Sequence, residues 1–153
     1  MMIKHIKCDI FKSGADVICH QVNCQGVMGS GIAKQVREKY PNNYKGYCAM
    51  CKEFKPSELL GEVFCGKTSD KFIIANLFAQ ENFGYDGKCY TDYESLRKCL
   101  QNVANGFENQ TIAIPYLMGC HRGGGDWNIV YQMIEEIFAD SDCEVLICEY
   151  NGG

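Results

Sequence analysis

The stretch of sequence that decides the fold is His20-Gln21-Val22-Asn23-Cys24-Gln25-Gly26-Val27-Met28-Gly29-Ser30-Gly31-Ile32-Ala33. It begins in an apolar run typical of a buried strand, passes through a glycine-rich turn and ends where a helix is predicted. This order places free backbone N–H groups and a helix N-terminus at the carboxyl end of a strand, which suits a phosphate group. The spacing matches neither Gly-x-Gly-x-x-Gly nor Gly-Lys-Ser/Thr, which disfavours a dinucleotide fold and an ATP-type loop. On spacing alone, a tight turn that needs small residues explains the stretch equally well.

A second glycine-rich segment also lies between a predicted strand and a predicted helix. It reads Gly119-Cys120-His121-Arg122-Gly123-Gly124-Gly125-Asp126. Consecutive glycines raise the entropy cost of folding, and a plain turn rarely needs three of them. Arg122 offers positive charge to a phosphate and His121 offers an acid or base, although both residues suit an exposed loop equally well. The two loops together predict a cradle for a ligand with more than one phosphate.

Elsewhere in the chain, predicted strands alternate with predicted helices. Apolar runs predict strands at 2–7, 15–22, 61–66, 71–78, 111–115 and 142–150, and helices are expected at 30–40, 41–54, 91–105 and 126–138. Thr91-Asp92-Tyr93-Glu94 has the pattern of a capping box, and Asp126 is expected to cap the last helix. Because several strands are apolar on both faces, we expect an α/β domain over residues 1–153 with a mixed, largely parallel sheet between helical layers.

Composition limits the classes of partner. The chain has 153 residues, 46% of them hydrophobic, which is enough for one domain with a sizeable core. Its net charge of −4 argues against an extended basic surface for nucleic acid. An anionic ligand is therefore expected to be held by backbone amides more than by Lys or Arg.

The eleven cysteines indicate a reducing environment. Most lie at apolar positions, and Cys48 and Cys51 form the one C-x-x-C pair. With no second pair and no His grouping to complete a zinc site, we expect reduced thiols, no metal and a cytoplasmic location. No signal peptide and no apolar run long enough to cross a membrane are evident, so no membrane partner is expected.

Together these segments resemble the macrodomain family, whose members bind ADP-ribose and its derivatives. The resemblance rests on Cys8-Asp9-Ile10, on Val22 to Ala33, on Ile114-Pro115 through Gly119, and on Asp126-Trp127. The first loop is similar to that of the branch containing ADP-ribose 1″-phosphate phosphatases and terminal or DNA-linked ADP-ribose glycohydrolases. The resemblance implies a three-layer α/β/α fold with a mixed six-stranded sheet.

The resemblance also implies a set of ligand-binding residues. Asp9 is expected to meet the adenine amine, and Ile10 the adenine through its backbone; without the resemblance, Asp9 equally suits a turn or cap. Asn23 and the first loop are expected to line the distal ribose and diphosphate, and the second loop to close over the diphosphate. The loop residues concerned are Gly29, Ser30, Gly31, Ile32, Ala33, Gly119, Cys120, Arg122, Gly123, Gly124 and Gly125.

Catalysis follows less directly from the resemblance. Glycohydrolases of this branch carry a nucleophilic lysine where this chain has Gln80, and glutamine cannot form the corresponding covalent intermediate. The phosphatase-like relatives imply Asn76, Asp86 and His121 as counterparts of their Asn, Asp and His side chains. We expect hydrolysis of an ADP-ribose derivative without a cofactor. The alternatives are a non-catalytic reader of free or attached ADP-ribose and, more remotely, a different nucleotide-binding module.

Overall fold

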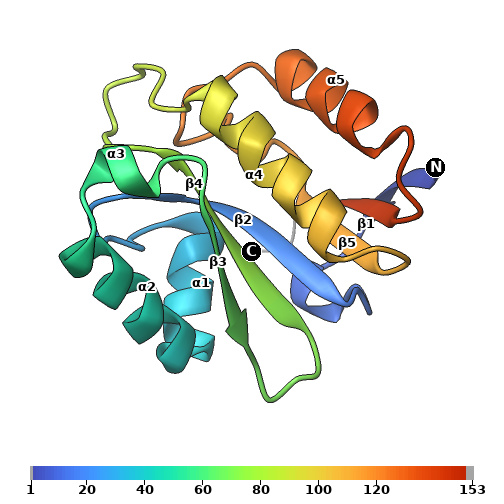
Figure 1. The fold of residues 1–153 in the computed structure, drawn as a ribbon, viewed down its shortest axis with the longest axis horizontal. Coiled ribbons are helices and arrows are strands. Elements are labelled where there is room, and N and C mark those ends of the chain that lie inside the picture. The colour runs from blue at the N-terminus through green and yellow to red at the C-terminus, as the bar shows by residue number, and fades with distance from the viewer. Residues whose placement is uncertain (1, 151–153) are drawn as a thin grey trace.

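The computed structural model of the chain describes residues 2–150. The ends of the predicted domain, residues 1 and 151–153, lie outside the described residues. A six-stranded sheet with strand order β1-β6-β5-β2-β4-β3 forms the centre (Figure 1), and its neighbouring strands are parallel except for the antiparallel β3–β4 pair. The predicted mixed, largely parallel sheet of six strands is thus confirmed. The strands are β1 (Met2–Lys7), β2 (Val17–Asn23), β3 (Val63–Lys67), β4 (Ile73–Gln80), β5 (Thr111–Pro115) and β6 (Glu144–Glu149).

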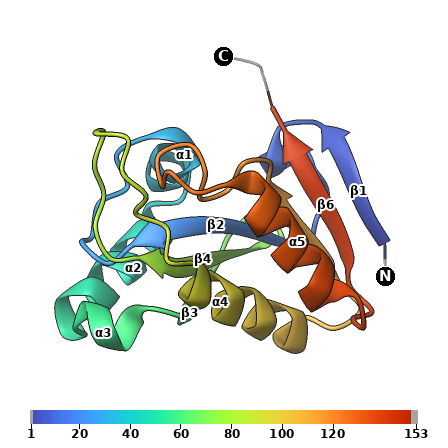
Figure 2. The same cartoon turned by 90° about the horizontal axis from the view of Figure 1, so that it is seen from above.

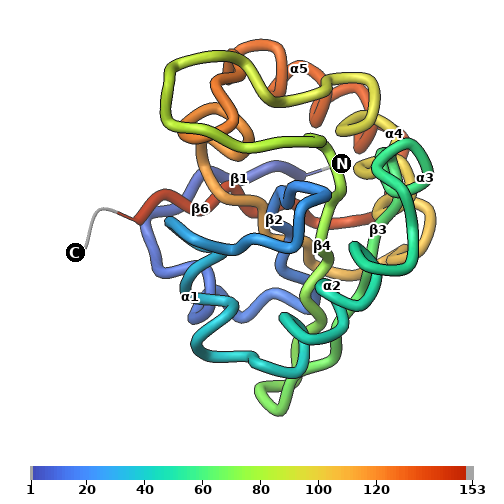
Figure 3. The backbone as a smooth tube through the Cα atoms, turned by 90° about the vertical axis from the view of Figure 1, so that its left-hand side faces the viewer, coloured from blue at the N-terminus to red at the C-terminus, as the bar shows by residue number. Residues whose placement is uncertain are grey.

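Helices cover both faces of the sheet, as Figure 3 shows from the side. The helices α4 (Tyr93–Gly106) and α5 (Trp127–Phe138) pack on one face around Leu96, Leu100 and Ile134, all of them fully buried. The helices α1 (Gly31–Lys39) and α2 (Pro41–Glu53) pack on the other face through Val36 and Tyr47. Two short elements, η1 (Ile10–Lys12) and α3 (Pro56–Leu59), were not predicted, because a single turn is too short to show a helical period.

The helix starts show which local signals decide the structure. Asp126 caps α5 as predicted, accepting a hydrogen bond of 2.9 Å from the Asn128 N–H. The predicted capping box at Thr91 is wrong, since α4 begins at Tyr93 with Asp92 as its N-cap. The Thr91 hydroxyl instead donates to the carbonyl oxygen of Gly119, so a contact between distant segments replaces the local cap.

The sheet opens between its central strands β2 and β5, at the edge formed by the carboxyl ends of the parallel strands. These strands pair only at Val17 with Ile112 and at Ile18 with Ala113, whereas β2 stays paired with β4 as far as Asn23. The parallel strands all end at this edge, and Figure 2 shows the loops that follow β2, β4 and β5 gathering there. A crevice outside the carboxyl ends of parallel strands, where neighbouring strands diverge, is the usual ligand site of α/β sheets.

The cysteines lie within this fold as free thiols. Burial raises the pKa of Cys24 and Cys99 to about 12, which keeps these thiols protonated and poorly nucleophilic at neutral pH. Within residues 2–150, no three His, Cys, Asp or Glu side chains gather in a way that could hold a metal ion. No helix in the same range is both long and apolar enough to span a bilayer.

Candidate functional site

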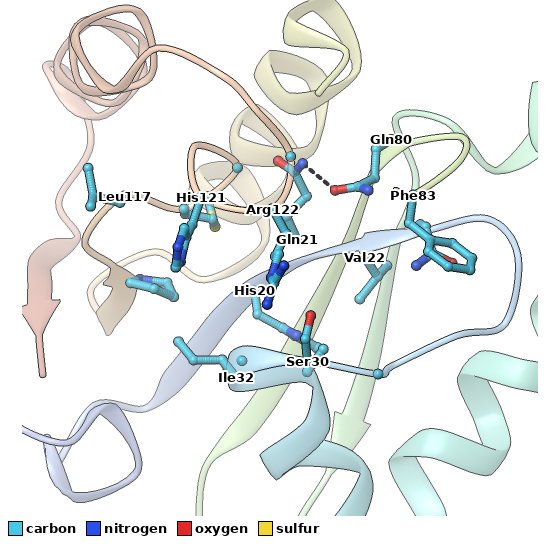
Figure 4. Close-up of a pocket in the computed structure, with 18 of the residues that line it drawn as sticks. His20, Gln21, Val22, Ser30, Ile32, Gln80, Phe83, Leu117, His121 and Arg122 are labelled. Carbon is cyan, nitrogen blue, oxygen red and sulfur yellow. Dashed lines mark hydrogen bonds between the residues drawn. The ribbon is translucent and has the colours of Figure 1, made fainter. Parts of the chain in front are cut away.

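A pocket of about 510 Å³ occupies the open edge of the sheet (Figure 4). Its floor is the end of β2, from His20 to Asn23, together with Gln80 at the end of β4 and Pro115 at the end of β5. Its walls come from three loops, 24–30, 81–92 and 116–126, of which the first and third were singled out in the sequence. The volume lies in the range of small-molecule sites.

Asn23 organises the first loop. Its Oδ1 accepts hydrogen bonds from the Gln25 N–H at 2.9 Å and from the Tyr47 hydroxyl at 2.8 Å, and its Nδ2 donates to the Val27 carbonyl at 2.8 Å. Asn23 lines the pocket but is 7% exposed. Its side chain therefore fixes the path of the loop.

The first loop delivers an open helix N-terminus to the pocket wall. Ser30, the N-cap of α1, makes no hydrogen bond from its side chain to the helix, and Gly31 begins α1 with a φ of +59°. Because the first N–H groups of a helix have no intrahelical acceptor, those of α1 remain available to an anion, with the positive end of the helix dipole behind them. The predicted residues Gly29, Ser30, Gly31, Ile32 and Ala33 all line the pocket.

The glycines of the second loop are required by packing. A Cβ placed on Gly123 would overlap the Thr91 hydroxyl, and one on Gly124, whose φ is +70°, would overlap the Lys88 carbonyl. A Cβ placed on Gly119, whose φ is +76°, would lie 2.6 Å from Gln21 Oε1. Gly119, His121, Arg122 and Gly123 line the pocket, whereas Cys120, Gly124 and Gly125 are absent from its lining. Much of the triple glycine thus serves the contact between two loops.

The loop between β4 and α4, from which Asp86 was predicted to act, forms a wall whose aromatic residues were not predicted. Phe83, Gly84 and Tyr85 line the pocket, and the Arg122 guanidinium lies 4.4 Å from the centre of the Tyr85 ring. Phe83 and Tyr85 are 43% and 65% exposed, so two aromatic rings stand at the pocket mouth. A clue was present, because exposed aromatic side chains in a polar loop are a common mark of a binding surface.

A polar chain along the floor of the pocket ties two of its walls together. The Gln21 Nε2 donates to Gln80 Oε1 at 2.8 Å and to Thr91 Oγ1 at 2.9 Å, and the first of these bonds is drawn in Figure 4. The Thr91 hydroxyl in turn donates to the Gly119 carbonyl, and Gln80 Nε2 donates to the Asn82 carbonyl at 2.8 Å. Gln80 is therefore held in place by both ends of its amide.

The three predicted catalytic side chains do not meet. His121 lines the pocket and is exposed. Asn76 is fully buried away from the pocket lining, where it bonds to His20 and to Asn43. Asp86 is exposed on the loop after β4 and accepts hydrogen bonds from the Lys88 N–H at 3.2 Å and the Tyr90 hydroxyl at 2.9 Å, which lower its pKa. Of the three, only His121 is placed to touch a ligand in the pocket.

The predicted adenine residues lie beside one end of the pocket. Asp9 is the N-cap of η1, where its carboxylate accepts from the Phe11 N–H at 3.0 Å, and Ile10 is 4% exposed. Neither is part of the pocket lining, but Cys8 donates its N–H to the carbonyl of Glu149, which is a lining residue. Asp9 thus combines the capping role with a position next to the β6 end of the pocket.

Residues 19–134 match the sequence model of the Macro domain family. The chain belongs to the macrodomain family. A DNA ADP-ribosyl glycohydrolase from Mycobacterium tuberculosis is 28% identical over 157 residues, covering 99% of this chain and 43% of the relative. An ADP-ribose 1″-phosphate phosphatase from Scheffersomyces stipitis is 43% identical over 68 residues, covering 39% of each protein. This macrodomain thus spans less than half the length of these curated relatives.

The solved macrodomain of Mycobacterium tuberculosis DarG has a similar fold. It superposes on this macrodomain with a TM-score of 0.79 at 25% sequence identity, covering 96% of this chain and 97% of that one. The three-layer arrangement implied by the resemblance in sequence is thus confirmed for the fold as a whole.

Proposed function

We propose that this macrodomain binds the ADP-ribose moiety in the pocket at the open edge of its sheet. One observation carries the proposal: residues at the open N-terminus of α1 and residues of the second glycine loop line the same pocket. Such a site offers backbone N–H groups to a diphosphate. Arg122 is the one Lys or Arg among the described lining residues, in keeping with an anion held mainly by amides.

Hydrolysis of an ADP-ribose derivative is the first candidate activity. The substrate would be ADP-ribose 1″-phosphate or an ADP-ribosyl linkage, the classes named for the two relatives. His121 supports this activity, because an exposed imidazole in the pocket is able to move a proton to or from an attacking water. Neither a metal nor a cofactor is part of this proposal.

A non-catalytic reader of ADP-ribose is the second candidate, and Gln80 favours it. An amide at this position replaces the lysine implied by the glycohydrolase branch, and its hydrogen bonds to Gln21 and Asn82 restrain it further. The burial of Asn76 and the position of Asp86 outside the pocket lining also leave His121 without the predicted partners.

Calorimetry followed by turnover assays tests both candidates. We expect micromolar affinity for ADP-ribose and weaker binding of AMP, which lacks the second phosphate and the distal ribose. Equal affinities for the two ligands would overturn the binding proposal. Release of phosphate from ADP-ribose 1″-phosphate, or of ADP-ribose from modified DNA or protein, would establish hydrolysis. Micromolar binding with no turnover on any of the three substrates would establish the reader.

A further inference from the structure

His20 is a buried histidine in the floor of the pocket. It is 3% exposed, and burial lowers its pKa to about 4, so the imidazole is neutral at pH 7. Its Nε2 lies 2.7 Å from Asn76 Oδ1, while Asn76 is itself bonded to Asn43 and to the Phe64 carbonyl. Figure 4 draws His20 among the pocket residues, with Ser30 of the first loop.

The partners of Asn76 fix the tautomer of His20. A backbone carbonyl can only accept, so the Asn76 atom that faces the Phe64 carbonyl at 2.8 Å must be the amide nitrogen. The other amide atom is then the oxygen, which accepts from the imidazole. His20 Nε2 therefore carries the proton, and Nδ1 of the neutral ring is a bare acceptor.

No described group donates to this acceptor. Within residues 2–150, His20 Nδ1 and Gln21 Oε1 are the two buried side-chain N or O atoms without a hydrogen-bond partner. Gln21 Oε1 is covered by the second loop, since a Cβ built on Gly119 would lie 2.6 Å from it. Buried acceptors are rarely left unpaired, because the missing bond costs about 1–3 kcal/mol. The described residues thus supply no donor to His20 Nδ1, so we expect a bound molecule to supply one.

We propose that His20 Nδ1 accepts a hydrogen bond from a ribose hydroxyl of the bound ligand. The inference rests on the proposed binding of ADP-ribose. Phosphate oxygens are acceptors and cannot pair with a bare nitrogen lone pair, whereas ribose hydroxyls donate. The adenine amine also donates, but its proposed partner Asp9 follows β1, which β6 and β5 separate from β2 in the sheet. His20 would then select a hydroxyl beside the helix N-terminus that holds the diphosphate.

Nitrogen-15 NMR of the imidazole rings tests the proposal directly. The chain has three histidines, and the ring resonances of His20 are those absent from the spectrum of His20→Phe. Saturation with ADP-ribose should shift the Nδ1 resonance of His20 upfield, as expected when a bare ring nitrogen accepts a hydrogen bond. A shift of Nδ1 with ADP-ribose but not with ADP assigns the donor to the distal ribose. An equal shift with both ligands assigns the donor to the adenosine ribose.

Two other results have distinct meanings. Shifted backbone amides with an unmoved Nδ1 would overturn the role of His20 while leaving ADP-ribose binding intact. No shift anywhere at saturating ADP-ribose would overturn the proposed function, and this inference with it.

A pair of variants separates binding from scaffolding. His20→Phe keeps the ring volume but removes the acceptor, and it should weaken ADP-ribose binding about fivefold to tenfold, the effect of one hydrogen bond. Asn43→Ala disturbs the same buried network and leaves Nδ1 in place, so it should lower the melting temperature with little change in affinity. An equal loss of affinity in both variants would mean that His20 is only structural.

Discussion

Thr91 Oγ1 donates a hydrogen bond of 2.6 Å to the carbonyl oxygen of Gly119, which joins the loop after β4 to the loop after β5. Thr91 is 7% exposed and also accepts from Gln21, so one side chain links both loops to the floor of the pocket. The shape of the pocket therefore depends on a contact between segments that are 28 residues apart in the chain.

Replacing this threonine tests how far the loops depend on each other. Thr91→Val keeps the volume but removes both hydrogen bonds, and it should lower the free energy of unfolding by about 1–3 kcal/mol and weaken ADP-ribose binding. Urea unfolding and calorimetry measure the two effects. Thr68→Val is the matched control, because Thr68 also donates to a carbonyl, that of Phe72, in the β3–β4 turn. If both variants bind ADP-ribose alike, the loops hold their positions without Thr91.

Gly31→Glu should abolish ADP-ribose binding in a protein that still folds. A Cβ at Gly31 meets no atom within 4 Å, so the glutamate would extend into open space at the helix N-terminus. Its charge would oppose a bound diphosphate, with unit charges interacting by about 4 kcal/mol at short range and an effective dielectric of 20. The positive φ adds about 1–2 kcal/mol of backbone strain.

Gly14→Glu controls for that strain. Gly14 has a φ of +77° and equally open surroundings, but it precedes β2 at the opposite edge of the sheet. It should destabilise the fold similarly and leave the calorimetric titration unchanged. Wild-type affinity in folded Gly31→Glu would show that the first loop is only a turn.

Asp9→Asn should weaken ADP-ribose binding about tenfold without destabilising the protein. One amide oxygen is enough to keep the cap on the Phe11 N–H, whereas the negative acceptor proposed for the adenine amine is lost. Asp16→Asn is the comparison, since Asp16 also accepts a backbone N–H, that of Thr111 at 2.8 Å, at the far end of β2. Unchanged affinity in Asp9→Asn would leave Asp9 with its capping role alone.

His121→Ala should lower turnover and spare binding. General acid–base catalysis contributes about 10²- to 10⁴-fold, so kcat on the substrate that the wild type hydrolyses should fall at least 100-fold. The calorimetric affinity for ADP-ribose should stay within about twofold, because the loop amides remain. Turnover equal to that of the wild type would remove His121 from the mechanism.

The buried His20 should make stability depend on pH between neutral and mildly acidic conditions. Its pKa is lowered from 6.5 to about 4 in the folded state, chiefly by burial, so the unfolded chain binds the proton more readily. The free energy of unfolding is therefore unaffected by this group above pH 6.5 and decreases as the pH falls toward 4. The full decrease is about 3 kcal/mol at 1.36 kcal/mol per pKa unit.

Urea unfolding at pH 7 and pH 5 measures this effect. The His20→Phe variant serves as the reference, because it retains the carboxylates that also titrate in acid. It should lose less stability than the wild type between the two pH values. Equal losses in the two proteins would show that His20 is not the group responsible.

Short-range signals made much of the fold predictable. The strands β1 and β5 match their predicted bounds, and α5 begins after its predicted cap Asp126. The first loop and its position before a helix were likewise evident, because a strand, a glycine turn and an amphipathic helix follow one another directly in the chain. Each of these features depends on residues within a few positions of one another.

The composition of the site was less predictable, as Asn76 illustrates. It lies inside an apolar run, and only its tertiary contacts with Asn43 of α2 and His20 of β2 show that it is enclosed away from the pocket. Phe83 and Tyr85 were missed because their exposure at the pocket mouth, and the contact of Tyr85 with Arg122, depend on segments far apart in sequence.

By itself, the sequence determined the order of strands and helices, the family and the first glycine loop, since apolar period, caps and turn residues are local properties of the chain. Only the tertiary structure decided which side chains share the pocket. It showed that Gly123 and Gly124 make room for Thr91 and Lys88, and that His20 keeps a bare nitrogen at the pocket floor. Both facts arise from contacts between segments far apart in sequence, whose distances are set when the sheet and its two helical layers pack together.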